Sequence, residues 1–135
     1  MADSAWTQMV NEDGYNLQYV DEADRTEALC RLAMLSNGDA YPFVPVALRT
    51  PVIRNISVQS SAGRSIQYMN ADEQTNELLM MAMNVNGMLL QYVCVQTADI
   101  CEAAIRQNPD CWKYVRDQTP ALYSLLLTRK KDAKL

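Results

Sequence analysis

Few residues in this sequence have the types and the spacing that catalysis requires. The chain contains no histidine, so neither a Ser–His nor a Cys–His pair can activate a nucleophile. Asp99 and Glu102 lie three positions apart, and on a helix this spacing would put two carboxylates on one face for general acid–base chemistry. Acidic side chains near the start of a helix also simply complement the helix dipole. We favour this second interpretation, and the sequence therefore predicts a protein that is not an enzyme.

The cysteines could hold a metal ion, and they are Cys30, Cys94, Cys101 and Cys111. Zinc sites use paired, short cysteine spacings and usually histidine, and the sequence has neither. Cys30 and Cys101 each stand four residues after a recurring threonine, at a position that faces a core. We interpret them as small buried hydrophobic residues and expect neither a metal nor another cofactor. A disulfide in an extracellular setting stays an alternative.

These residues belong to a pattern that occurs five times along the chain. An aromatic residue followed by an apolar one recurs about every 22 to 25 positions, and a threonine follows each pair. The pairs are Tyr19-Val20, Phe43-Val44, Tyr68-Met69, Tyr92-Val93 and Tyr114-Val115, and the threonines are Thr26, Thr50, Thr75, Thr97 and Thr119. Self-similarity at such a period is typical of stacked structural repeats.

Each threonine is expected to cap the N-terminus of a helix, where its hydroxyl accepts a bond from a free backbone N–H. Pro51 and Pro120 follow two of them at the first helical position, which proline tolerates. Apolar residues at helical spacing then predict a helix of about three turns. Gly38, Gly63 and Gly87 end three of these helices, and we expect them to adopt the left-handed corner conformation. A short second helix of one to two turns completes the unit.

The predicted fold is all-α: a small α-solenoid of about five helix–corner–short-helix repeats of 22–25 residues. We expect one domain over residues 1–128, followed by a basic tail over 129–135 that frays or folds back over the last helix. The glutamines before three of the recurring tyrosines are expected to bond the neighbouring unit as a ladder. The units lie near residues 4–37, 38–62, 63–86, 87–108 and 109–128, and the glutamines are Gln18, Gln67 and Gln91.

The segment 86–93, Asn-Gly-Met-Leu-Leu-Gln-Tyr-Val, precedes the cap Thr97 and a helix with an inner alanine pair. This arrangement resembles the tandem helical repeat catalogued as domain of unknown function 4116. The resemblance is clearest over residues 75–119 and weakest over 40–61, where Tyr41, Pro42 and Arg54 depart from the pattern. It implies an all-helical stack, similar to repeats in bacterial effector-like, protist and large-virus proteins. It supplies no catalytic or binding residues.

Charge and composition exclude several classes of protein. The formal net charge is −4 and about a fifth of the residues are charged, so the chain has an ordinary globular composition that repels phosphate and argues against nucleic-acid binding. No apolar run is long enough to cross a membrane, and the first residues lack a basic-then-apolar signal segment. The sequence therefore predicts a soluble cytoplasmic protein.

The second unit departs most from the pattern and is our candidate partner surface. Residues that break a repeat without a local structural gain tend to be functional, and tyrosine and arginine are enriched at binding hot spots. We expect Arg54 to lie along the apolar stripe with its head group in water. An acidic connector lies next to this unit, although a merely solvated connector is the simpler interpretation. The candidate residues are Tyr41, Arg49, Arg54 and Arg64, with Asp21, Glu22 and Asp24 from the connector.

The last helix is the most apolar in the chain, and Tyr123 and Leu127 extend its apolar arc with no following unit to cover them. Such a patch favours a homodimer joined through this helix. Together these features predict a non-enzymatic protein–protein interaction module that docks on a larger protein as an adaptor or an inhibitor. The alternative is a small-ligand-binding protein or an enzyme that uses a pocket not visible in the sequence.

Overall fold

The computed structural model describes residues 2–133, without the side chains of residues 2–4 and 133. Over this range the chain is helical and contains no β-strand, which confirms the all-α prediction. The chain forms two compact units, the first ending at Tyr68 and the second beginning at Met69. This boundary lies inside the predicted repeat of residues 63–86. Each of the helices α1 to α5 is followed by a short 3-10 helix.

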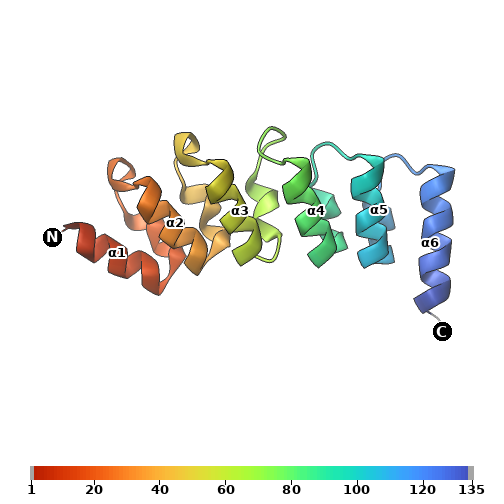
Figure 1. Ribbon diagram of the computed structural model, residues 1–135, viewed down its shortest axis with the longest axis horizontal. Helices are drawn as coiled ribbons and strands as arrows, with labels where there is room; N and C mark the ends of the chain where they lie inside the picture. Colours follow the sequence, from red (N-terminus) through yellow and green to blue (C-terminus); the bar gives the residue numbers. More distant parts are fainter. Residues whose placement is uncertain (1, 134–135) are drawn as a thin grey trace. The chain divides into compact units, whose positions relative to one another are not determined.

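The first unit arranges its α-helices and its longer 3-10 helices in two rows (Figure 1). In one row, α2 packs between α1 and α3, and in the other, η3 packs between η1 and η5. The α-helices are α1 (Ala2–Glu12), α2 (Glu27–Ser36) and α3 (Pro51–Ser60), and the 3-10 helices are η1 (Gly14–Tyr19), η2 (Glu22–Asp24), η3 (Gly38–Phe43), η4 (Val46–Leu48) and η5 (Arg64–Tyr68).

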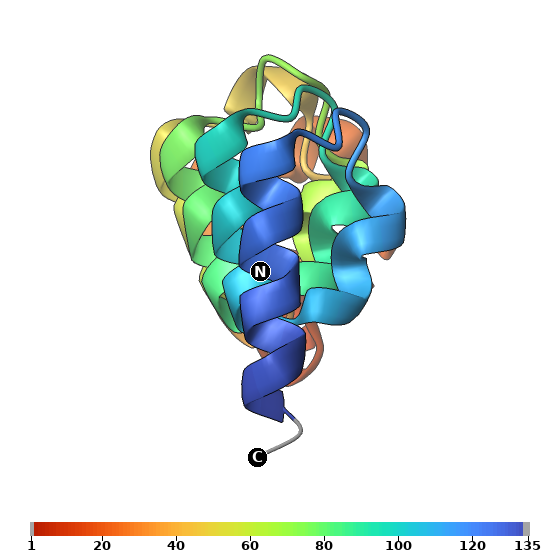
Figure 2. The same ribbon diagram turned by 90° about the vertical axis from the view of Figure 1, so that its right-hand side faces the viewer.

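The second unit has the same two-row arrangement, which Figure 2 shows from its C-terminal end. Here α5 packs between α4 and α6, while η6 packs against η7. The elements are α4 (Asn76–Val85), η6 (Gly87–Tyr92), α5 (Ala98–Gln107), η7 (Pro109–Tyr114) and α6 (Pro120–Ala133). The predicted short return helices are therefore 3-10 helices of up to six residues.

The threonine caps are confirmed at every predicted position. In each case the hydroxyl oxygen accepts a hydrogen bond from the backbone N–H three residues later, at 3.2 or 3.3 Å. This bond satisfies one of the donors that the first helical turn leaves free. The capped pairs are Thr26 with Leu29, Thr50 with Ile53, Thr75 with Leu78, Thr97 with Ile100 and Thr119 with Leu122.

The ends of these helices differ from the prediction. Asn37 and Asn86 close α2 and α4 in an extended conformation, with φ of −157° and −153°. Each asparagine side chain then accepts the N–H two residues later, so that one residue ends an α-helix and caps the following 3-10 helix. The predicted left-handed corner is wrong at Gly38 and Gly87, because among the described residues only Ala62 and Gly63 have positive φ.

The glycines are instead required by close packing. A Cβ added at Gly14, Gly38 or Gly87 would lie closer than 3.0 Å to a backbone carbonyl oxygen. These oxygens belong to Ala33, Ser57 and Ala104, which are buried residues of the next α-helix along the chain. A glycine on the 3-10 helix and a small residue on the α-helix therefore allow the two elements to pack at backbone distance.

The core of each unit contains apolar side chains from both the α-helices and the 3-10 helices. Leu17, Met34 and Ile53 are fully buried in the first unit, as are Met83 and Leu90 in the second. The dominant apolar contribution to stability comes from these side chains.

Three of the cysteines join the core. Cys30, Cys101 and Cys111 are buried, as predicted for the first two, whereas Cys94 is exposed. All four are free thiols. Burial in apolar surroundings raises the pKa of the Cys30 and Cys111 thiols to about 11.

The last helix is longer than the sequence pattern indicates. Residues 129–133 continue α6, where the sequence predicts a frayed tail from Arg129 onward. Arg129 and Asp132 face each other one turn apart at 3.7 Å, and basic side chains in the last turn complement the negative end of the helix dipole. Lys134 and Leu135 lie outside the described residues.

No helix within residues 2–133 is both long enough and apolar enough to span a membrane.

Candidate functional site

The polar residue before the cap threonine connects neighbouring repeat units at Arg25, Gln74 and Gln96. Gln74 donates from Nε2 to the carbonyl of Tyr92 at 2.8 Å, and its Oε1 accepts the backbone N–H of Cys94 at 2.9 Å. Gln96 repeats both bonds with Tyr114 and Arg116, at 2.7 and 3.0 Å. Sequence reasoning missed this role, although a long polar residue occupies this position in every unit: Arg25, Arg49, Gln74, Gln96 and Gln118.

The predicted glutamine ladder is wrong. Gln18, Gln67 and Gln91 each donate to the carbonyl three residues earlier, within their own 3-10 helix. These exposed amides therefore satisfy local backbone groups, and neighbouring repeat units are connected by Arg25, Gln74 and Gln96.

The structure removes Tyr41 from the candidate partner surface. Its side chain is completely buried in the first unit, and the guanidinium of Arg49 lies over its ring, 4.8 Å from the ring centroid. A residue with no accessible surface cannot contact a partner. Tyr41 departs from the repeat pattern because it fills the core, and its position next to a cation adds a favourable cation–π contact.

Arg49 and Arg54 also have structural roles that the sequence did not reveal. Arg49 donates to the carbonyls of Val44 and Pro42 at 3.0 and 3.3 Å. Arg54 donates from Nε to the carbonyl of Arg49 at 2.9 Å, so its head group binds the connector instead of lying freely in water. The premise that these arginines bring no local structural gain is therefore wrong.

The remaining candidates of this surface are exposed. Arg64 pairs with Asp39 at 2.8 Å, and the hydrogen bonds that its guanidinium donates to this carboxylate raise the pKa of the arginine above its ordinary value. Because the guanidinium is more than half exposed, such a pair contributes at most about 1 kcal/mol. Among the described residues, no ion pair or hydrogen bond connects Arg64 to the exposed acidic residues of the connector, which are Asp21, Glu22 and Asp24.

The candidate dimer face lies on α6. Tyr123 and Leu127 are each 50% exposed, one turn apart, while Leu122 and Leu126 on the same helix are buried. The ring of Tyr123 contacts the ring of Trp112, with 5.9 Å between the centroids. The described structure therefore leaves a small apolar patch on this helix.

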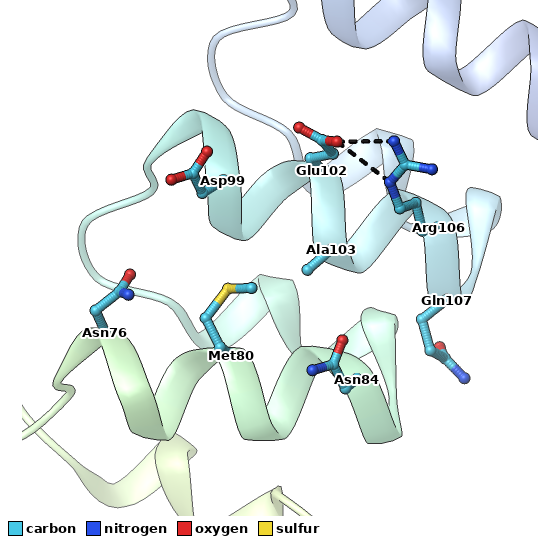
Figure 3. A pocket seen from close by; sticks show the side chains of 8 residues that line it. All are labelled: Asn76, Met80, Asn84, Asp99, Glu102, Ala103, Arg106 and Gln107. Carbon is cyan, nitrogen blue, oxygen red and sulfur yellow. Dashed lines mark hydrogen bonds and ion pairs between the residues drawn. The ribbon is translucent and has the colours of Figure 1, made fainter.

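A groove of about 560 Å³ lies between α4 and α5 (Figure 3). It contains the two carboxylates that the sequence singled out, and they lie on the α5 side of the groove. The side chains that line it are Asn76, Met80 and Asn84 from α4, and Asp99, Glu102, Ala103, Arg106 and Gln107 from α5.

One small residue explains why the groove is open. The position six residues after the cap threonine is occupied by Ala103 in α5 and by a large apolar residue in the other units. These larger residues are Leu32, Ile56, Met81 and Leu125. The missing side-chain volume at Ala103 lies directly opposite Met80 (Figure 3).

The polar groups of the groove fall into two classes. Glu102 and Arg106 form an ion pair at 2.8 Å, and Gln107 accepts the backbone N–H of Gly87 at 2.6 Å. In contrast, the side chains of Asn76, Asn84 and Asp99 have no hydrogen-bond partner within the part of the chain that the structure describes. The second class is available to an external ligand.

This arrangement suits binding better than covalent chemistry. The lining contains no hydroxyl, thiol or amine that could act as a nucleophile, and one of its two carboxylates is already neutralised by Arg106. Nowhere in residues 2–133 do three or more histidine, cysteine, aspartate or glutamate side chains gather as a metal site. The groove can therefore offer hydrogen bonds, one free negative charge and an apolar floor.

Comparison with family models, with curated proteins and with solved structures found no match to this chain. The resemblance to the repeat catalogued as domain of unknown function 4116 thus stays a prediction.

Proposed function

We propose that this chain is a non-enzymatic interaction module that docks on a larger protein as an adaptor or an inhibitor. The observation that carries the proposal is a contrast between the residues that precede α4 and α5 and the residues that line the groove between these helices. Gln74 and Gln96 use their amides to join neighbouring units, while Asn76, Asn84 and Asp99 line an open groove without a partner in the described chain. Side chains that are not needed for packing in a repeat protein are free to recognise another molecule.

The architecture that supports this function is a small α-solenoid of about five repeats. The supporting observations recur in both units: a threonine cap opens the helix, and a glycine packs against the backbone of the next α-helix. Such a scaffold exposes a large surface for its size and needs no cofactor. It fits the resemblance to the tandem helical repeat described above.

The partner is a protein, and the setting we propose is the cytoplasm. The acidic balance of the chain disfavours nucleic acid. The free thiols of Cys30, Cys94, Cys101 and Cys111 suit a reducing compartment. A homodimer through Tyr123 and Leu127 is compatible with this role, because it would double the number of docking surfaces.

The groove also favours a second candidate, binding of a small ligand. Its volume of about 560 Å³ lies within the range of small-molecule sites. Such sites are mostly apolar and enclosed, whereas this groove is open and has only Met80 and Ala103 as apolar lining. The lining therefore supports a protein partner better than a drug-sized ligand.

The test is affinity capture with the full chain from a lysate of the cells that encode it, followed by crosslinking of the purified complex. We expect one protein in a stoichiometric amount, with crosslinks to α4 and α5 or to the surface near Arg64 and η2. Charge reversal at Asp99 should weaken partner binding if the partner uses the groove between α4 and α5. Charge reversal at Arg64 should weaken it if the partner uses the surface near Arg64 and η2. If no protein co-purifies, and a metabolite panel raises the melting temperature instead, the small-ligand function replaces this proposal.

A further inference from the structure

We infer that the α4–α5 groove binds an extended peptide segment that carries a lysine or arginine. The inference rests on the proposed function and names the chemistry of the partner at one site. It begins from the geometry in Figure 3, where Asn76 on α4 and Asp99 on α5 lie at the same end of the groove. Asn84 lies toward the other end, and Met80 lies between the two asparagines.

The asparagine pair matches an extended backbone. A carboxamide offers both an N–H donor and a carbonyl acceptor, the two groups that a peptide unit presents. Asn76 and Asn84 are separated by eight residues on α4, which corresponds to about 12 Å along the helix axis. An extended chain covers this distance in about four residues. Two peptide units about four residues apart can therefore bond both amides at once.

The floor between the asparagines selects against a helix. An amphipathic helix needs a broad apolar stripe on its partner, but only Met80 and Ala103 provide apolar surface here. One side chain of an extended segment fits over this floor, in the volume that the alanine leaves open. The larger residues at the corresponding position of the other units would occupy this space.

Charge complementarity defines the remaining contact. Glu102 and Arg106 neutralise each other, so Asp99 is the one charge of the lining without a counter-ion among the described residues. It is exposed at the end of the groove. A lysine or arginine of the segment pairs with this carboxylate, while a phosphate-bearing or acidic segment is repelled.

The experiment is a selection of linear peptides of about seven residues, displayed on phage, against the full chain. We expect enriched peptides with a lysine or arginine at one fixed position and an apolar residue close to it. The best peptide is then made with a fluorescent label, and its affinity is measured by anisotropy. A second peptide replaces the basic residue by glutamine.

Two variants and one control give the expected pattern. Ala103→Leu restores the residue found at Leu32 and Leu125, and it should weaken binding by about tenfold or more through a clash while the helicity is kept. Asp99→Asn should weaken binding about two- to fivefold, as for an exposed charge pair, and should abolish the preference over the glutamine peptide. Asp110→Asn makes the same change on an exposed residue of η7 and should have no effect.

Several outcomes overturn the inference. The first is a selection that enriches no peptide, and the second is enrichment of peptides that lack a basic residue. The third is a labelled peptide that binds the parent and a folded Ala103→Leu variant equally well. Asn76→Ala combined with Asn84→Ala provides a second test at exposed positions, where loss of helix stability is small. If a captured protein partner binds Ala103→Leu and Asp99→Asn as tightly as the parent, this inference fails while the proposed function stands. If peptides bind the groove but no protein partner is recovered, the proposed function fails while this inference stands.

Discussion

Gly87 packs directly against the backbone carbonyl of Ala104, so that a Cβ added to the glycine would lie closer than 3.0 Å to the carbonyl oxygen. The contact joins the start of η6 to the middle of α5, and the N–H of the same glycine donates to Gln107 at 2.6 Å. The glycine is therefore required by packing, because its φ does not lie in the left-handed region.

Gly87→Ala should destabilise the protein by about 1–3 kcal/mol, since backbone atoms must move to accept the methyl group. Urea unfolding followed by circular dichroism measures this change. Gly63→Ala is the control for a conformational cost, because Gly63 has φ of 88°. A Gly87→Ala variant that unfolds at the same urea concentration as the parent would contradict the packing role.

Leu90→Ala should cost about 2–5 kcal/mol in unfolding free energy, because the fully buried leucine of η6 leaves a cavity. Leu35→Ala on α2 removes the same atoms from an exposed site, so we expect a change within about 0.5 kcal/mol. Both are measured by the same urea titration. Similar midpoints for the two variants would argue against the burial of Leu90.

Gln74→Ala should destabilise the protein by about 1–3 kcal/mol, because it breaks two hydrogen bonds and leaves the Tyr92 carbonyl without its partner. The control is Gln91→Ala, whose exposed amide bonds only within its own 3-10 helix. Thermal unfolding of both variants tests the assignment. An equal loss in both would mean that the residue before the cap threonine does not connect the units.

Stability should fall as the pH rises from about 9 to 11, because the folded state keeps Cys30 and Cys111 protonated. Their folded pKa is raised to about 11 from an ordinary value of 9.0. The contribution is therefore fully present below pH 9 and is lost as the pH approaches the folded pKa. Each thiol accounts for roughly 1–3 kcal/mol of the unfolding free energy that is lost over this pH range.

Tyrosine and lysine also titrate in this range, so the comparison is made with Cys30→Ala and Cys111→Ala. The unfolding free energy of each variant should depend less steeply on pH than that of the parent between pH 9 and 11. Parallel pH profiles for the parent and both variants would contradict the raised pKa values.

Multi-angle light scattering at micromolar concentration should give about twice the monomer mass of 15.2 kDa if the apolar patch on α6 joins two copies. Tyr123→Asp combined with Leu127→Asp places charges on the exposed patch and should restore the monomer without loss of helicity. A parent chain that is monomeric at every concentration tested would exclude the homodimer.

Local chemistry in the sequence determined much of this structure. A threonine cap forms its hydrogen bond three residues along the chain, so its role at Thr26 and Thr119 follows from short-range geometry. Helical spacing likewise predicts the buried positions of Cys30 and Cys101. Each of these features depends on residues within a few turns of one another.

Tertiary contacts decided the rest. Tyr41 is buried although its position suggested a surface, and Gln74 bonds a residue 18 positions away. The groove exists because Ala103 faces Met80 of another helix. No local rule specifies which side chains meet across two packed elements, since the relative placement of those elements arises from the packing of the whole unit. The threonine caps therefore follow from the sequence alone, whereas the burial of Tyr41 and the long-range bond of Gln74 arise only from the tertiary structure.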